Sequence, residues 1–81
     1  MASRNYEIMN LPVPISKDCI SHRQKILYRR GYIRGRLAVN RGDSITKESL
    51  VGLDSCFLRG LFDGYIAELD YELEQKIAKK D

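Results

Sequence analysis

Few residues in this chain are able to perform acid–base chemistry. The lone histidine, His22, follows Asp18 by four residues, which places both on one face of a predicted helix. An aspartate so placed can orient an imidazole as a general base. No serine or cysteine nucleophile is predicted beside the pair, and a simple ion pair near the helix start is the favoured interpretation. We therefore expect no enzymatic activity and no catalytic residues.

Carboxylates and thiols are the other groups with site chemistry. Asp70 and Glu74 are one helical turn apart and suit a shared metal ion, but acids at this spacing are more typical of a solvated helix face. Cys19 and Cys56, with only His22 besides, are too few for a zinc site built from Cys and His. We expect two reduced thiols, no metal and no cofactor.

Arginines give the clearest sign of binding chemistry. Residues 16–41 hold eight Lys/Arg and one acidic residue, whereas residues 54–81 hold four Lys/Arg and seven acidic residues. Guanidinium groups recognise carboxylates and phosphates in bidentate geometry. The basic half of the chain therefore suits an acidic protein, the acidic half of this same chain, or nucleic acid.

A narrow apolar strip runs between these arginines on the first long predicted helix. At 100° per residue, Ile26, Ile33 and Leu37 fall on one side, and basic residues flank them on both sides. The same helix has a second, broader apolar face, so it has two surfaces to cover. This favours self-association or a protein partner. The candidate partner-binding residues are Arg23, Ile26, Arg29, Arg30, Ile33, Arg34, Leu37 and Arg41.

Nucleic-acid binding is the alternative. Arginines of this helix could contact phosphates while the interleaved Tyr28 and Tyr32 stack on bases. A helix-turn-helix is not indicated, because Asp43 and Glu48 fall where that motif buries apolar side chains. Our leading hypothesis is a regulatory module, a homo-oligomer that binds and modulates another protein. Its short length and helical character, without a catalytic constellation, are typical of a phage or plasmid accessory protein.

An eleven-residue pattern occurs twice, at 28–38 and 57–67, and each copy contains Arg-Gly-x-x-x-Gly-x-x-Ala. Both copies lie in helical periodicity, where each interior glycine costs about 1 kcal/mol relative to alanine. Close approach of two helices over small residues would offset that cost. Packing of the two copies within one chain is the favoured interpretation, and packing between chains is the alternative. The helix-packing glycines are Gly31, Gly35, Gly60 and Gly64.

The first half of the chain is predicted to comprise an arm and a long helix. Pro12 and Pro14 indicate an extended N-terminal arm over residues 1–15. A single helical domain over residues 16–81 follows. Its first helix is expected over 17–41, capped by Ser16 with Ile15 and Ile20 as a hydrophobic staple, and ended by Gly42.

The second half is predicted to contain a short helix and a second long one. Thr46 or Ser44 caps a short helix through Val51, and Asp54 caps a final helix over 55–79. One unbroken helix over 46–79 is the alternative. The fold class is therefore all-α, with two long helices forming an antiparallel hairpin. No apolar run approaches a membrane span and no signal peptide is apparent, so we expect a cytoplasmic protein with no membrane partner.

Overall fold

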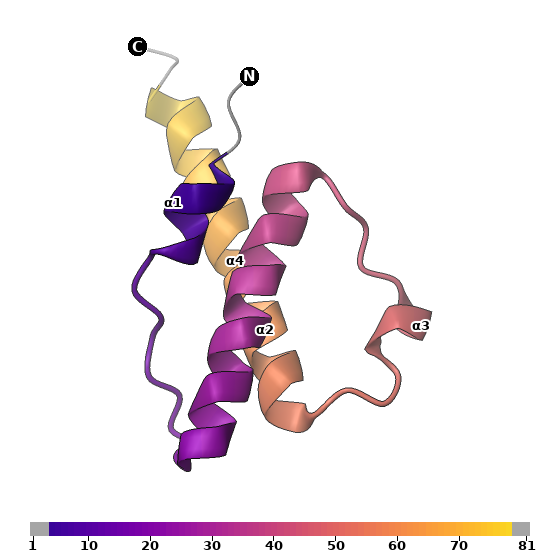
Figure 1. Cartoon of the computed structure of the whole chain (residues 1–81). Coiled ribbons are helices and arrows are strands. Elements are labelled where there is room, and N and C mark those ends of the chain that lie inside the picture. Colours follow the sequence, from indigo (N-terminus) through magenta and orange to yellow (C-terminus); the bar gives the residue numbers. More distant parts are fainter. Residues whose placement is uncertain (1–3, 79–81) are drawn as a thin grey trace.

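The computed structural model describes residues 4–78, which form four α-helices and no β-strand. The helices are α1 (Asn5–Met9), α2 (His22–Arg41), α3 (Lys47–Leu50) and α4 (Ser55–Ala78). The two long helices, α2 and α4, pack against each other, and α1 packs against α2 (Figure 1). The predicted all-α fold is confirmed. None of these helices has the length and apolar character needed to cross a membrane.

The long helices run in the same direction, so the predicted antiparallel arrangement is wrong. Gly31 of α2 lies against the backbone of Phe57 and Leu61, and Gly35, one turn later, lies against Leu61 and Tyr65. Later residues of α2 therefore meet later residues of α4. Figure 1 shows the same arrangement, with both helices rising from the bottom of the view.

The connection between the long helices explains why they are parallel. Residues 42–54 return the chain from the end of α2 to its beginning, with α3 on the way (Figure 1). The 20 residues of α2 make a helix about 30 Å long, a distance that an extended connection of this size can span. Ile45 and Leu50 are half-buried, so apolar contacts keep the returning chain close to the helices.

The N-terminal segment also differs from the prediction. Residues 1–3 lie outside the described part, but Asn5–Met9 forms the short helix α1 rather than an extended arm. The prolines at 12 and 14 follow the end of this helix, so they do not prevent it from forming. Ile8 is fully buried, and its burial holds α1 against the rest of the protein.

The first long helix begins five residues later than predicted. Ser21, not Ser16, is the N-cap: its Oγ accepts the Gln24 N–H at 3.1 Å, while the Gln24 Oε1 accepts the Ser21 N–H at 3.1 Å. This reciprocal capping box satisfies two backbone donors. The Ser16 Oγ accepts the Asp18 N–H, at 3.4 Å, and Cys19 stands where a reciprocal Glu or Gln would be needed. The predicted staple does not form, since Ile15 and Ile20 are 92% and 72% exposed.

The predicted end of the first long helix and the predicted starts of the last two helices are confirmed, whereas α3 ends at Leu50 rather than Val51, and the predicted end of the last helix at residue 79 lies outside the described residues. Gly42 ends α2 in the left-handed conformation at φ 77°, and Thr46 caps α3 by accepting the Ser49 N–H. Asp54 accepts the Cys56 N–H at 2.7 Å at the start of α4. A second left-handed glycine, Gly52 at φ 81°, separates α3 from α4 and excludes one continuous helix there.

The four helical glycines bring the backbones of α2 and α4 into direct contact. A Cβ on Gly31 would lie 2.1 Å from the Phe57 carbonyl oxygen, and a Cβ on Gly60 would lie 2.1 Å from the Tyr28 carbonyl oxygen. Tyr28 and Phe57 occupy the same place in the two sequence copies. The copies thus pack on each other within one chain, in register and related by an approximate two-fold axis.

Candidate interaction surface

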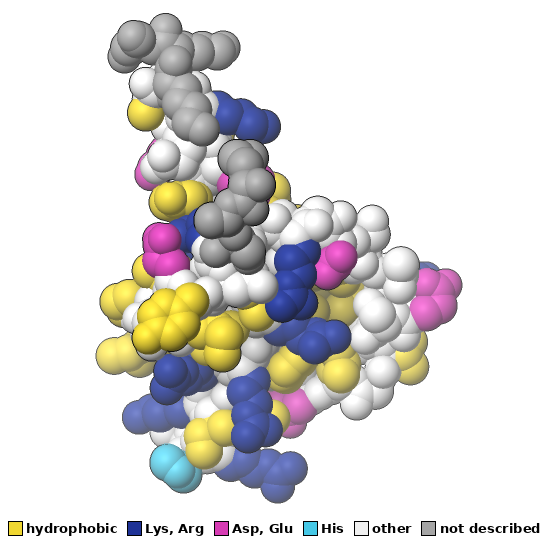
Figure 2. All heavy atoms as spheres, turned by 45° about the horizontal axis from the view of Figure 1, so that its top comes forward, with side chains coloured by type: hydrophobic (Ala, Val, Ile, Leu, Met, Phe, Trp, Pro, Cys, Tyr) yellow, Lys and Arg dark blue, Asp and Glu magenta, His cyan; other side chains and the backbone are white. Residues whose placement is uncertain are grey.

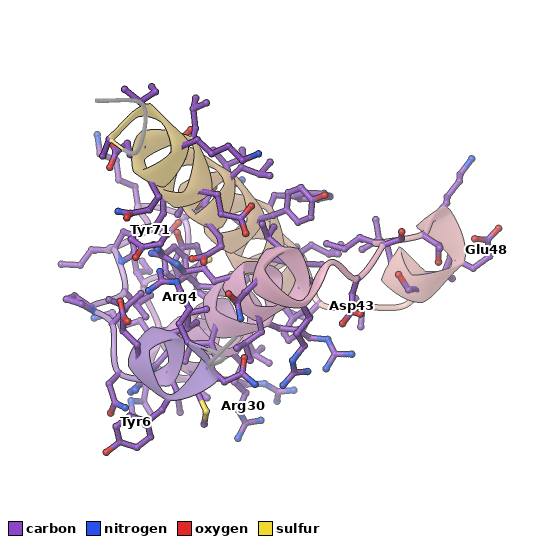
Figure 3. All side chains as sticks on the ribbon, turned by 90° about the horizontal axis from the view of Figure 1, so that it is seen from above. Arg4, Tyr6, Arg30, Asp43, Glu48 and Tyr71 are labelled. Atoms are coloured by element: carbon purple, nitrogen blue, oxygen red, sulfur yellow. The ribbon has the colours of Figure 1, made fainter. Side chains whose placement is uncertain are left out.

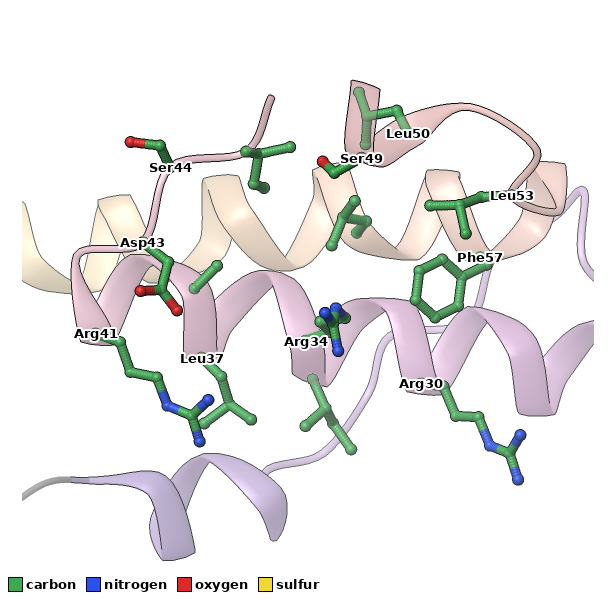
Figure 4. A pocket seen from close by; sticks show the side chains of 14 residues that line it. Arg30, Arg34, Leu37, Arg41, Asp43, Ser44, Ser49, Leu50, Leu53 and Phe57 are labelled. Atoms are coloured by element: carbon green, nitrogen blue, oxygen red, sulfur yellow. The ribbon is translucent and has the colours of Figure 1, made fainter. Parts of the chain in front are cut away.

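An open groove lies between α2 and the returning connection (Figure 4). Its volume of about 740 Å³ is within the range of natural ligand-binding pockets. One wall belongs to α2, and we call the whole feature the arginine groove. The wall on α2 consists of Arg30, Ile33, Arg34, Leu37, Ala38 and Arg41. The remaining lining residues are Asp43, Ser44, Ile45, Ser49, Leu50, Leu53, Phe57 and Leu61.

The polar edge of the arginine groove is strongly basic. Arg30, Arg34 and Arg41 are exposed, and none of them forms an ion pair or a side-chain hydrogen bond with another residue in 4–78. The side chains of Arg30 and Arg41 extend away from the connection in Figure 4. Apolar side chains from the connection and from α4 also line the groove. Such a surface offers charge recognition and apolar contact side by side.

The structure brings together five of the eight predicted partner-binding residues. These five line the arginine groove: Arg30, Ile33, Arg34, Leu37 and Arg41. The other three lie apart from it. Arg29 borders a smaller pocket of about 210 Å³ against the segment 13–16, and Arg23 and Ile26 are exposed nearer the start of α2.

The predicted Asp18–His22 pair does not share a helical face. Asp18 precedes α2, and its carboxylate pairs with Arg59 of α4 at 3.2 Å. His22 is the exposed first residue of α2. The predicted geometry was wrong because it depended on a helix that begins before Asp18.

Within residues 4–78, no group of three or more His, Cys, Asp or Glu side chains is arranged to hold a metal ion. Cys19 and Cys56 are free thiols that lie with Tyr28 and Tyr32 in one buried cluster. Cys19 lies in the segment before α2, not on a helix as expected, and Cys56 lies in the first turn of α4. A hydrogen bond with Cys19, together with burial, raises the pKa of Cys56 to about 11.

Cys56 should therefore resist alkylation in the folded protein. With a pKa of about 11, roughly one thiol in a thousand is ionised at pH 8, and the thiolate is the reactive form. We expect iodoacetamide to modify Cys56 at least a hundredfold more slowly than in urea, as measured by peptide mass spectrometry. Equal rates in the folded and unfolded protein would contradict this placement.

A buried ionic network joins α1, α2 and α4. Glu68 is completely buried, and its carboxylate accepts hydrogen bonds from Arg4 Nε at 2.8 Å, Arg4 Nη2 at 3.0 Å and Arg36 Nε at 2.9 Å. Arg36 Nη1 also donates to the Tyr32 hydroxyl at 3.0 Å. The Arg4 guanidinium lies 3.7 Å from the centre of the Tyr71 ring, as Figure 3 illustrates. These contacts fix α1 on the long helices.

Burial raises the pKa of Glu68, but the hydrogen bonds from Arg4 and Arg36 lower it by more, so its net pKa is below the ordinary value. The pKa of Arg4 is raised, chiefly by its hydrogen bond to Glu68. Sequence reasoning missed this network because it treated the acidic residues of the final helix as a solvated face. The available signal was spacing: the buried residues Leu61, Gly64 and Glu68 follow one another at intervals of three and four residues.

The two tyrosines proposed for base stacking serve the interior instead. Tyr28 and Tyr32 are buried and stack on each other with ring centroids 6.3 Å apart. The Tyr28 hydroxyl donates to Asp63 at 2.5 Å, and burial together with this bond raises the pKa of Tyr28.

On the face shown in Figure 2, Lys and Arg side chains gather over the body of the protein, with exposed hydrophobic side chains among them.

Comparison with protein-family models, curated proteins and solved structures finds no match for this chain.

Proposed function

We propose that this chain is a non-enzymatic, cytoplasmic interaction module that binds and modulates another protein. The arginine groove is its binding site, and the ligand is a segment that combines acidic and apolar side chains. One observation carries the proposal: three arginines without ion-pair partners in residues 4–78 border an apolar groove of about 740 Å³.

The apolar lining supports a protein ligand. Ile33 and Leu37 of α2 line the groove together with Leu50 and Leu53 of the connection and Phe57 of α4. Burial of such side chains supplies most of the binding free energy at about 25 cal/mol per Å² of apolar surface. The guanidinium groups at the edge then select acidic partners and fix their orientation. This division matches the apolar centre and polar rim of protein interfaces.

Self-association forms part of the proposal. The sequence prediction rested on two apolar faces of the first long helix, but the broader of these is covered by α4. The support now comes from α4 itself, where Phe62, Ile66, Leu69, Leu73 and Ile77 are all exposed. Exposed apolar surface of this continuity is typical of an interaction site.

The nucleic-acid alternative keeps one supporting observation. The α2 arginines 23, 29, 30, 34 and 41 are all exposed and could contact phosphates. The burial of Tyr28 and Tyr32 removes the stacking groups on which that hypothesis depended. What remains is a purely electrostatic surface, for which the apolar groove has no role.

Replacing Arg30 and Arg34 together with glutamate should abolish partner capture, and so should Ile33→Asp alone. Both changes should leave the helical content intact, because the arginines are exposed and Ile33 is only half-buried. A photo-crosslinking residue at Ser49, on the groove wall, identifies the captured segment by mass spectrometry. We expect an acidic segment with apolar residues at helical spacing.

The matched control is Lys17→Glu with Lys25→Glu, which gives the same change in net charge outside the groove and should leave capture unchanged. Nuclease treatment separates the two functions. If only the arginine variant loses its ligand, and that ligand is nuclease-sensitive with steep salt dependence, nucleic-acid binding replaces the protein-binding proposal.

A further inference from the structure

From Phe62 onward, α4 carries an apolar seam that no other described element covers. Its five residues, each 44–60% exposed, follow one another at intervals of three or four, so they share one side of the helix. The seam consists of Phe62, Ile66, Leu69, Leu73 and Ile77. The last turns of α4 extend beyond the end of α2 (Figure 1), which leaves this side accessible.

An acidic ridge borders the seam. Asp63, Asp70 and Glu74 are exposed and lie on the same flank of the apolar residues at 100° per residue. Their intervals along the chain are seven and then four. A chain that covers the seam must therefore bring apolar side chains together with positive charge.

The arginine groove has the complementary pattern. Arg30, Arg34 and Arg41 lie at intervals of four and then seven, which is the reverse order of the acidic ridge. If α4 lay antiparallel to α2, Arg30 would oppose Glu74, Arg34 would oppose Asp70, and Arg41 would oppose Asp63. Three charge pairs would form in one register, and the seam would face the apolar lining of the groove.

We infer that the segment bound in the arginine groove is the α4 seam of a second copy of this chain, docked antiparallel to α2. The inference rests on the proposed function, because it assigns the ligand of that same groove. Antiparallel pairing of two seams with each other is disfavoured, since the acidic ridges of both copies would then meet. Groove and seam are different surfaces, so the contact is head-to-tail and builds a ring or a filament.

Reversal of charge on each surface tests this inference in the full-length chain. The groove variant is Arg30→Glu with Arg34→Glu, and the seam variant is Asp70→Lys with Glu74→Lys. Wild type should sediment above the 9.4 kDa monomer at micromolar concentration. Each variant alone should be monomeric, because like charges then face each other. An equimolar mixture should regain association at least tenfold tighter than either variant alone.

Other outcomes overturn the inference. The inference is wrong if wild type is a monomer or if either folded variant still associates on its own. It is also wrong if a mixture of the two folded variants stays monomeric. Circular dichroism establishes that the variants are folded. A seam substitution without charge reversal, Leu73→Asn, should also abolish assembly of the wild type, whereas exposed Gln75→Asn outside the seam should not.

A second measurement separates this inference from the proposed function. A fluorescent peptide of residues 62–78 should bind wild type and lose at least tenfold in affinity for the groove variant. If that peptide fails to bind while the crosslinker at Ser49 captures an acidic segment of another protein, the inference is wrong and the proposed function stands. If neither ligand occupies the groove, both are wrong.

Discussion

Replacing Gly60 with alanine should lower the free energy of unfolding by about 2 kcal/mol, although alanine is the better helix former by about 1 kcal/mol. The new Cβ would meet the Tyr28 carbonyl oxygen at 2.1 Å and the Tyr32 nitrogen at 2.9 Å. Both atoms belong to the backbone, so no side chain can rotate to make room. The helices must separate, which weakens contacts along their whole length. Urea unfolding measures the loss, a large part of the total for a domain of this size.

The same steric reasoning predicts how two glycine substitutions combine. Gly31→Ala should destabilise by a similar amount, since its Cβ would meet the Phe57 oxygen at 2.1 Å. The double variant should lose less than the sum, because helices already forced apart by one methyl group accommodate the second. Gln75→Ala, at an exposed position of α4, is the control and should change stability by less than about 0.5 kcal/mol. Stabilisation by Gly60→Ala would contradict the backbone contact.

The sequence contained the contact between the long helices but not its direction. Two equal glycine stripes nest in either orientation, because a stripe of glycines has no side chains to distinguish its ends. The direction depends on the connection, where half-buried Ile45 and Leu50 hold the chain against the helices as it returns. Such short apolar contacts have no periodicity in the sequence, so they gave no signal against a hairpin.

The start of α2 was predictable from the sequence. Ser21-x-x-Gln24 is a complete capping box, whereas Ser16 has no Glu or Gln three residues later, where Cys19 stands. The burial of Cys19 in the preceding segment favours the later start, since it ties that segment to the core beside Cys56. Local hydrogen bonding therefore outweighed an apparent hydrophobic staple.

One wall of the candidate site was predictable from the sequence, but the other was not, because the course of the connection was not predicted. Its wall on α2 follows from helical periodicity, which correctly grouped Arg30, Ile33, Arg34, Leu37 and Arg41. The opposite wall belongs to the connection and exists only because the helices are parallel. The periodicity of apolar residues also does not reveal a buried charge such as that of Glu68.

Replacing Glu68 with glutamine should destabilise the protein by about 3 kcal/mol at pH 7, because it leaves two mostly buried guanidinium groups without their counter-charge. The side chains of Arg4 and Arg36 are 14% and 11% exposed, so water compensates little. Glu48→Gln removes an exposed acid of α3 that lies outside both the groove lining and the seam, and it should change stability by less than about 0.5 kcal/mol. Thermal unfolding of the two variants gives the comparison.

The pH dependence of the stability lost in Glu68→Gln identifies the charge of Glu68 as the cause of that loss. The pKa of Glu68 is lowered in the folded protein, so its carboxylate binds a proton less readily there than in the unfolded chain. The stabilisation is therefore complete above the unfolded value of about 4.3 and is lost as the pH falls through the folded pKa. Below that pH, wild type carries a neutral acid at position 68, much like the glutamine variant. The difference in unfolding free energy between wild type and Glu68→Gln should therefore become smaller at low pH. A difference that stays constant from pH 7 to pH 2 would show that shape, not charge, holds α1 to the long helices.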